Sequence, residues 1–282
     1  MVLAYIDTNV FLDFYQSSTD RLAVFQDVVP RATHVLLTEQ TVNEFKRNRI
    51  ARLTQLAENV RKGSHGQLHT TAVVQALPGF KKWTAARDAT KAAADEIVKD
   101  LTSWVTDEQS DPVLTAFQQL VAAANFIPTS SQLIERARIR KLLGQPPTSP
   151  DKHSVGDELN WECLLTWNKT DLVIVTRDKT YLNNQALLKA EFSNATGKAL
   201  TLITESLSAA LEQIGQASET VTKAERDLPV KDDDFPWDGA CPKCGGILGE
   251  AGYEGSDGDS AWWLECGKCH SSFFPPAKPT PR

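Results

Sequence analysis

The feature that most constrains this chain is a short apolar strand that ends on an aspartate. Residues 2–6 read VLAYI, and Asp7 follows directly, before Thr8 and Asn9 open a helical pattern. An unbroken apolar run of this length is typical of a strand buried on both faces, as in a parallel sheet. Open α/β sheets place their ligands just beyond the carboxyl ends of the strands. The start of the chain therefore predicts an α/β fold with a polar site at Asp7.

The rest of the pattern alternates strands with helices. Further strands are predicted at residues 34–37, 172–176 and 199–203. Long helices are predicted after the capping residues Thr38 and Ser154 and from Ser206 to Leu228. Alternation of this kind implies a parallel sheet flanked by helices. Residues 67–144 are alanine-rich and helical with no predicted strand, so we expect a helical insertion there.

Length and composition define the expected domains. A chain of 282 residues suits one large domain and one small one. We expect an α/β domain over residues 1–228, an acidic linker over 229–239, a small module over 240–274 and a tail over 275–282. A net charge of −6 and a pI near 5.5 exclude a broadly basic coat, so nucleic acid would have to bind at local patches.

The apolar runs and the cysteines of the chain predict its cellular compartment. The chain has no apolar run near the roughly 18 residues of a membrane span, and its start does not resemble a signal peptide. Four of the five cysteines form two CxxC pairs, and Cys163 stands alone. This usage favours a metal site in a reducing cytoplasm over a disulfide framework.

Four acids occupy boundaries of the predicted elements: Asp7, Glu44, Asp157 and Asp178. In a parallel sheet such positions converge on the carboxyl edge, where their mutual repulsion is relieved by a hard divalent cation. Mg²⁺ and Mn²⁺ prefer oxygen ligands of this kind. Such a site would activate a water for phosphodiester hydrolysis. The alternative is that these acids cap helices, with Asp157 completing a capping box with Ser154 and Asp178 capping the next turn.

Four segments that contain these acids resemble the motifs of PIN-domain ribonucleases, in the same order. They are residues 6–12 (IDTNVFL), 38–45 (TEQTVNEF), 156–162 (GDELNWE) and 172–178 (LVIVTRD). The resemblance covers about residues 1–205. It implies a parallel sheet in the order 3-2-1-4 and metal-dependent RNA cleavage that leaves 5′-phosphate and 3′-hydroxyl ends.

Carried over by position, Asp7, Glu44, Asp157 and Asp178 would bind Mg²⁺ or Mn²⁺. Thr8 or Asn9 would support the first motif by hydrogen bonding, and Glu158 and Glu162 are further candidates. The long helical stretch between the second and third motifs departs from the small toxin-type members. A haloacid-dehalogenase-type phosphatase also begins with a strand and an aspartate, but its second aspartate two residues later is Asn9 here.

Two basic groups are candidate nucleic-acid contacts. One helix carries Arg136, Arg138, Arg140 and Lys141, and the helix that holds Glu44 carries Lys46, Arg47, Arg49 and Arg52. Either group could bind phosphates beside the acids. The alternative for both is an ordinary solvated helix face.

The C-terminal segment predicts a structural zinc site. Cys241 and Cys244 form one CxxC pair, Cys266 and Cys269 form another, and 21 residues separate Cys244 from Cys266. Four thiolates complete a tetrahedral zinc shell. The segment resembles a zinc ribbon, with hairpin strands at residues 247–253 and 261–265. Its aromatic residues would either cover a small core or stack on bases or a partner protein: Trp262, Trp263, Phe273 and Phe274.

The sequence thus predicts a metal-dependent endoribonuclease with catalytic Mg²⁺ or Mn²⁺ and structural Zn²⁺, acting on RNA. Two alternatives remain open. One is an adaptor whose PIN-like core binds and whose ribbon recruits a protein partner. The other is a structure-specific DNA nuclease. The sequence leaves the substrate and the oligomeric state undecided.

Overall fold

The structure is a computed structural model that describes residues 2–15, 21–63, 71–149, 153–226, 248–254, 260–266 and 272–273. It divides into two compact units, residues 1–221 and residues 222–282. Each unit is described by itself below. Within the described residues, no helix has both the length and the apolar character needed to cross a membrane.

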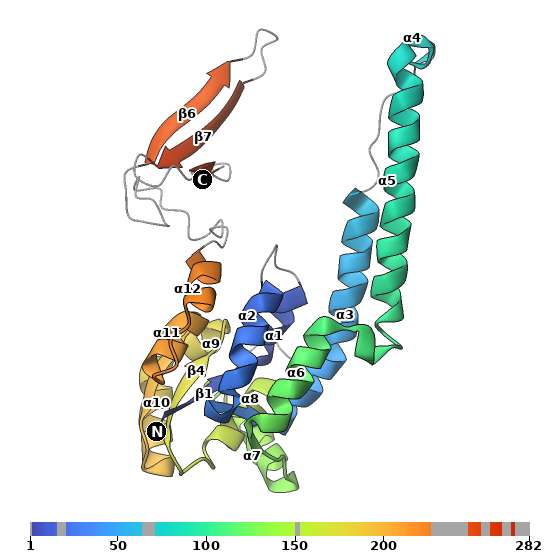
Figure 1. The fold of residues 1–282 in the computed structure, drawn as a ribbon. Coiled ribbons are helices and arrows are strands. Elements are labelled where there is room, and N and C mark those ends of the chain that lie inside the picture. The colour runs from blue at the N-terminus through green and yellow to red at the C-terminus, as the bar shows by residue number, and fades with distance from the viewer. Residues whose placement is uncertain are drawn as a thin grey trace. The chain divides into compact units, whose positions relative to one another are not determined.

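The first unit is built on a five-stranded parallel sheet (Figure 1). Its strands are β1 (Val2–Ile6), β2 (Val35–Thr38), β3 (Asn125–Ile127), β4 (Asp171–Val175) and β5 (Leu200–Thr204). They lie in the order β3-β2-β1-β4-β5, and every neighbouring pair is parallel. The α/β prediction is therefore confirmed. The order 3-2-1-4 that the resemblance implies is found for β3-β2-β1-β4, but its third strand is β3, which was not predicted, and the predicted strands at 172–176 and 199–203 are β4 and β5.

Strand β3 corrects the expectation that residues 67–144 contain no strand. It has three residues and pairs with β2, where Ile127 lies opposite Thr38. The Asn125 side chain donates to the carbonyls of Thr33 and Val35, at 2.9 and 3.2 Å, which fixes the end of this edge strand. A segment of three residues is too short to show the alternation of apolar and polar residues that identifies a strand. Only its pairing with β2 therefore reveals it.

Helices cover both faces of the sheet. Those around it are α1 (Thr8–Leu12), α2 (Arg21–Val28), α6 (Pro112–Ala123), α7 (Ser131–Leu142), α8 (Gly156–Leu164), α9 (Lys179–Asn183), α10 (Gln185–Thr196) and α11 (Leu207–Gln213), with 3-10 turns η1 (Asp13–Tyr15), η2 (Val29–His34) and η3 (Glu108–Ser110). A further helix, α12 (Glu219–Arg226), runs across the boundary between the two units.

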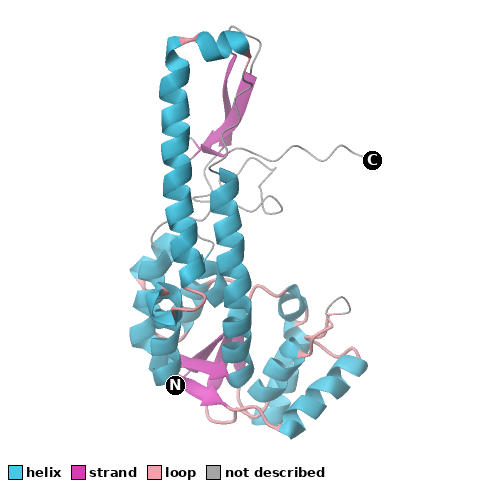
Figure 2. Cartoon of the chain, turned by 90° about the vertical axis from the view of Figure 1, so that its right-hand side faces the viewer, coloured by secondary structure: helices cyan, strands magenta, loops and turns pink. Residues whose placement is uncertain are grey.

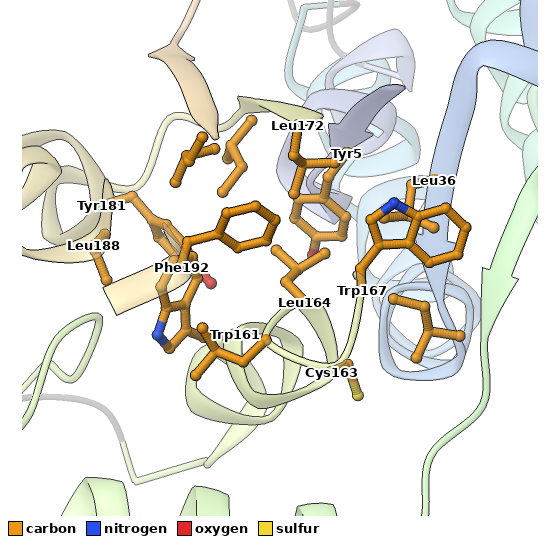
Figure 3. Packing of buried hydrophobic residues seen from close by; sticks show 14 of the residues in the cluster. Tyr5, Leu36, Trp161, Cys163, Leu164, Trp167, Leu172, Tyr181, Leu188 and Phe192 are labelled. Atoms are coloured by element: carbon orange, nitrogen blue, oxygen red, sulfur yellow. The ribbon is translucent and has the colours of Figure 1, made fainter. Parts of the chain in front are cut away.

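Two apolar cores form because alternate residues of each strand point to opposite faces. Leu3 and Tyr5 of β1 belong to one buried cluster, together with Trp161 of α8 and Phe192 of α10. Figure 3 shows Trp161 and Phe192 close to Leu164 and Tyr181 in this cluster. A second cluster consists of packed aromatic rings from α1, η1, α2, α3 and α6: Phe11, Phe14, Tyr15, Phe25, Phe45 and Phe117.

A helical arm leaves the sheet between β2 and α6. It consists of α3 (Glu39–Gly63), α4 (Ala72–Ala76) and α5 (Pro78–Ser103), and α3 lies beside α5 (Figures 1 and 2). The side chain of Thr38 accepts from Thr41 N at 3.0 Å at the start of α3, as predicted, and the helix ends at Gly63. The first half of α3 belongs to the domain core, and its second half extends into the arm.

Helix caps agree with the sequence in some places and correct it in others. Asp111, which precedes a proline, caps α6 and Ser130 caps α7 through their side chains. Helix α8 instead begins at Gly156, and its N-cap residue is Val155 rather than Ser154. The apolar side chain of Val155 cannot accept a hydrogen bond, so this helix has no side-chain cap. The expected single helix over residues 206–228 is divided into α11 and α12, because Gly215 adopts a left-handed conformation with φ of 72°.

The second unit contains an antiparallel sheet of β6 (Leu248–Glu254), β7 (Ser260–Cys266) and β8 (Ser272–Phe273). The β6–β7 hairpin matches the strands expected for the C-terminal module. Cys266 is the last residue of β7 and pairs with Leu248. Cys241, Cys244 and Cys269 lie outside the described residues, so the zinc site stays a prediction.

Candidate active site

The carboxylate of Asp7 is fixed at the carboxyl end of β1. Its side chain is 8% exposed. Oδ1 accepts from the backbone N of Thr8 at 2.7 Å, and Oδ2 accepts from Asn9 Nδ2 at 2.8 Å and Thr176 Oγ1 at 2.6 Å. All three donors are neutral. The carboxylate is therefore oriented rigidly without having its charge cancelled by these partners.

Asn9 and Thr176 tie the ends of β1 and β4 together. Besides holding Asp7, Asn9 accepts from Arg177 N at 3.4 Å through Oδ1. Thr176 Oγ1 accepts from Asp178 N at 3.0 Å. Strands β1 and β4 are neighbours in register, with Ile6 opposite Val175. Asp7 and Asp178 therefore follow adjacent strand ends and share Thr176 as a hydrogen-bonding neighbour.

Asp178 also caps α9. Its Oδ1 accepts from the backbone N of Thr180 at 2.8 Å and from Thr180 Oγ1 at 2.7 Å. The cap alternative from the sequence is thus present in the geometry. A cap does not exclude a second role, because a carboxylate has more acceptor sites than these two bonds use.

Burial and neighbouring charges raise the pKa of Asp7 to about 7. Loss of hydration is the largest cause, the hydrogen bond from Thr176 opposes it, and the charges of Asp157 and Glu44 add to it. Asp157 and Glu44 therefore act on the Asp7 carboxylate from α8 and α3.

The charges of the four acids contribute to the raised pKa values of two buried tyrosines. Burial raises the pKa of Tyr5 well above its usual value, with further contributions from Asp7, Glu44 and Asp157. Burial likewise raises the pKa of Tyr181, with contributions from Tyr5 and then from Asp157, Asp7 and Asp178. The Tyr181 hydroxyl also donates to the Asp157 carbonyl at 3.1 Å. The Tyr181 contact brings Asp157, at the start of α8, beside α9, which Asp178 caps.

A buried chain of hydroxyls sets α3 against α8. Tyr5 Oη lies 3.0 Å from Thr41 Oγ1, which lies 2.9 Å from Thr38 Oγ1. Thr38 Oγ1 donates to Asn160 Oδ1 at 2.5 Å. Thr41 is three residues before Glu44, and Asn160 is three residues after Asp157. Because residues three apart share a helix face, this chain holds both acids on the facing sides of their helices.

Gly156 permits the close approach of these helices. A Cβ added at Gly156 would lie 3.0 Å from Gln40 Nε2 and 3.6 Å from Glu44 Oε2. The start of α8 therefore lies directly against the side chain of Glu44. This contact places Asp157, the next residue, at the same end of α8.

The donor set suits a hard divalent cation in its chemistry. In the described ranges of the chain, no group of three Asp, Glu, His or Cys side chains is arranged to hold a metal ion. Mg²⁺ commonly binds through only one or two carboxylates and keeps several waters, so a complete protein cage is not required. Asp7 with Glu44 or Asp157 would meet this need, and burial together with the charges of Asp157 and Glu44 raises the pKa of Asp7.

Glu158 and Glu162 belong to a different cluster. Glu162 Oε1 accepts from Arg140 Nε at 2.7 Å, and Arg136 lies 2.7 Å from its other oxygen. Glu158 pairs with Lys141 at 3.3 Å. Arg140 also binds Glu191, which accepts from Trp161 Nε1 at 2.9 Å. Glu158 and Glu162 are both buried, and they pair with cations on α7. They therefore do not belong to the group of acids around Asp7.

Two of the arginines expected to contact nucleic acid are buried instead. Arg140 is 5% exposed because it bridges α7 to Glu162 and Glu191. Arg49 is 2% exposed because its guanidinium binds Asp111 at 2.7 Å and the Trp104 carbonyl. Both act as structural ties. Arg47, Arg136 and Arg138 remain substantially exposed, with side chains at 63%, 48% and 64%.

Several site residues were not singled out from the sequence. They are Tyr5, Thr41, Asn160, Thr176 and Tyr181. Thr41, Asn160 and Thr176 lie inside the quoted motifs, whereas Tyr5 and Tyr181 lie just outside them, and each of the five is two or three residues from a candidate acid. A rule that examines polar residues one turn from each acid would have found Thr41 and Asn160.

Comparison with known proteins gives one match. A family model described as PIN domain matches residues 5–181, which is more than half of the chain. Searches of curated proteins and of solved structures found no match. The matched residues include Tyr5, all four acids, the last two residues of β1 and strands β2 to β4. PIN domains are in general nucleases, and this chain belongs to the PIN-domain family.

Proposed function

We propose that this protein is a metal-dependent endoribonuclease whose site is the acidic edge of the sheet. The observation that carries the proposal is the position of the acids: Asp7 and Asp178 follow adjacent strand ends and share Thr176, and Gly156, next to Asp157, lies against Glu44. The choice of RNA rests on the resemblance of the four motifs to PIN-domain ribonucleases.

The roles of the side chains follow from their positions. Asp7 is held in one orientation by neutral donors, so its charge remains available to a cation. Glu44 and Asp157 present carboxylates from two helices locked by the hydroxyl chain. Asp178 presents its carboxylate from the end of β4. Mg²⁺ or Mn²⁺ bound by these groups would supply an activated water and stabilise the leaving oxygen of a phosphodiester.

The test compares aspartates at the two ends of the same strand. Asp178 follows β4, whereas Asp171 begins it and accepts from Ala199 N at 2.9 Å. Asp7→Asn and Asp178→Asn should each reduce cleavage about a hundredfold or more, because metal stabilisation of transition-state charge amounts to several kcal/mol. Asp171→Asn keeps an acceptor for Ala199 and should cleave like the parent.

The assay uses the full chain with Mn²⁺, with Mg²⁺ and with EDTA, on labelled RNA and DNA of the same sequence. We expect RNA cleavage that requires the metal ion. The products should carry 5′-phosphate ends, which a phosphatase removes. Unchanged cleavage by both Asp7→Asn and Asp178→Asn would overturn the site assignment. Preference for DNA would correct the substrate, and binding without cleavage would favour an adaptor.

We further propose that the second unit is a zinc ribbon held by Cys241, Cys244, Cys266 and Cys269. A four-thiolate shell leaves no open position for water, so this zinc would be structural. The hairpin strands β6 and β7 support the proposal, since β7 ends on Cys266. Cys241→Ser and Cys266→Ser should each lose one zinc per chain by mass spectrometry and spare cleavage of a short oligonucleotide, whereas Cys163→Ser should keep the zinc. Retention of full zinc by both ribbon variants would contradict the assignment.

A further inference from the structure

The outer part of the helical arm differs from the rest of the first unit in charge. We define the distal arm as residues 52–63 of α3, all of α4 with Thr71 and Leu77, and residues 78–91 of α5. It contains seven basic and two acidic side chains, a net charge of +5, in a chain whose net charge is −6. The basic residues are Arg52, Arg61, Lys62, Lys81, Lys82, Arg87 and Lys91, and all but Arg52 are exposed.

The positive charge is confined to this part of α5. The remainder of the helix carries Asp95, Glu96 and Asp100 against Lys99. A surface that is basic at one end only is not the mixed solvated face of an ordinary helix. It is a local patch of the kind that an acidic chain needs in order to bind a polyanion.

Aromatic rings lie within the same patch. Phe80 and Trp83 stack with ring centroids 6.0 Å apart, and the Arg87 guanidinium lies 5.2 Å from the Trp83 ring. Both rings are only half-buried. Partly exposed aromatic rings set among basic side chains form a platform on which unpaired bases stack.

No residue of α4 is buried, and the buried residues of α5 begin at Ala94. Val73 is 73% exposed and Leu77 is 54% exposed. Isolated helices of about 12–15 residues are marginal in water. In the described part of the distal arm only Leu53 and Ala57 of α3 are buried, so α4 and residues 78–91 of α5 contribute no buried side chain, which favours a partner that covers them.

Helix α3 connects this patch to the acidic edge without a break. Lys62 is 18 residues after Glu44, which is five turns, so a straight helix places both on the same face about 27 Å apart. A strand bound at the distal arm would therefore follow one face of α3 to Glu44.

We propose that the distal arm binds single-stranded nucleic acid and guides it towards the acidic edge. Phosphates contact the basic side chains, and a base stacks on the Phe80–Trp83 platform. The direction of guidance rests on the proposed nuclease function, whereas binding itself does not. Charge complementarity and the aromatic platform together favour a single strand over an acidic protein.

The first test measures binding in EDTA, where metal-dependent cleavage is off. The probe is a fluorescent single-stranded RNA of about 20 nucleotides, long enough to span about 27 Å at 3.4 Å or more per nucleotide. Lys81→Glu with Lys82→Glu should weaken binding about tenfold or more and lower the slope of log affinity against log salt by about 0.7 per lost contact. The matched control is Lys99→Glu with Lys198→Glu, which changes the net charge equally outside the patch.

The second test addresses stacking. Trp83→Ala should weaken binding about fivefold or more and leave the salt slope unchanged, because a stacked base contributes without neutralising phosphate. Circular dichroism of each variant checks that α5 is intact, and Trp83→Phe should restore most of the affinity. Equal affinity for the distal and control lysine variants would overturn the proposal and leave the arm free for a protein partner.

The outcomes separate this inference from the proposed function. If the parent binds RNA through Lys81 and Lys82 but cleaves nothing with Mn²⁺, the arm inference stands and the nuclease proposal fails. If the parent cleaves and the distal variants bind and cleave like it, the arm inference alone fails. With both correct, the distal variants raise the KM for long substrates and cleave an oligonucleotide of about four nucleotides normally.

Discussion

Two groups of acids lie close to the sheet, and they differ in what surrounds them. The acids of the Arg140 cluster, Glu158, Glu162 and Glu191, contact cations from α7. The carboxylate of Asp7 is held by three neutral donors and lies within the field of Glu44 and Asp157. One group is compensated by the protein itself, and the other concentrates negative charge.

The difference teaches which acids are structural. A buried carboxylate costs free energy unless it is paired or hydrogen-bonded. In the Arg140 cluster that cost is offset by ion pairs that join α7, α8 and α10. At Asp7 the cost persists as a raised pKa, which a bound cation would remove. Glu158 and Glu162, only four residues apart, thus pair with cations on α7, whereas their neighbour Asp157 acts on the pKa of Asp7.

The largest expected effect comes from breaking the compensated group. Arg140→Met should lower the free energy of unfolding by about 3–5 kcal/mol, because it leaves Glu162 and Glu191 without this guanidinium. Urea unfolding at pH 7 measures it. Arg138→Met is the control, since its side chain is 64% exposed, and it should change stability by less than about 0.5 kcal/mol. Equal stability of the two variants would show that the cluster contributes little.

The next effect is the pH dependence caused by Asp7. The pKa of Asp7 is raised from 3.8 to about 7, so the folded state favours the neutral acid. Its contribution to stability is fully present below about pH 4 and is lost as the pH rises through 7. In EDTA, the stability of Asp7→Asn relative to the parent should therefore rise by up to about 1.4 kcal/mol per pH unit across this window.

Urea unfolding at several pH values between 5 and 8 checks this, with Asp171→Asn as the control whose difference from the parent should stay flat. A constant difference for Asp7→Asn would show that Asp7 is already ionised throughout the window.

A smaller effect should follow from adding metal. Mg²⁺ or Mn²⁺ at about ten times its dissociation constant should stabilise the parent by about 1.4 kcal/mol. The effect should be greater at pH 8 than at pH 6, because Asp7 must lose its proton to bind. Arg140→Met should respond to metal as the parent does, whereas Asp7→Asn should not. Thermal unfolding with and without EDTA measures this, and a full response from Asp7→Asn would remove Asp7 from the metal site.

The smallest effect concerns the exposed cation beside the acidic edge. Arg47 lies 3.5 Å from Glu44 and its side chain is 63% exposed. Arg47→Ala should change stability by less than about 1 kcal/mol, as is usual for surface ion pairs. It should also tighten metal binding slightly, because one competing positive charge is removed. Weaker metal binding in a titration would mean that Arg47 orients Glu44 instead.

The sequence by itself determined the features that depend on local pattern. The run at residues 2–6 required a buried strand, and its end placed Asp7 at the carboxyl edge of a sheet. Local signals are also present where α6 begins, at Asp111 before a proline, and where α3 ends, at Gly63. These features follow from residue period, caps and breakers, which act over a few neighbouring positions. The metal-binding roles of the four acids stay predictions.

Tertiary structure decided which charged and polar residues face inward. Arg49 pairs with Asp111, which lies 62 residues further along the chain, and Arg140 pairs with Glu191, which lies 51 residues further along. A basic helix pattern could therefore not reveal that these arginines are buried. The same holds for Thr176, which reaches Asp7 across 169 residues of chain. Strand β3 exists through its pairing with β2. In each case the partner is brought close only by the packing of distant elements, because a buried polar group must find its partner wherever the fold supplies one.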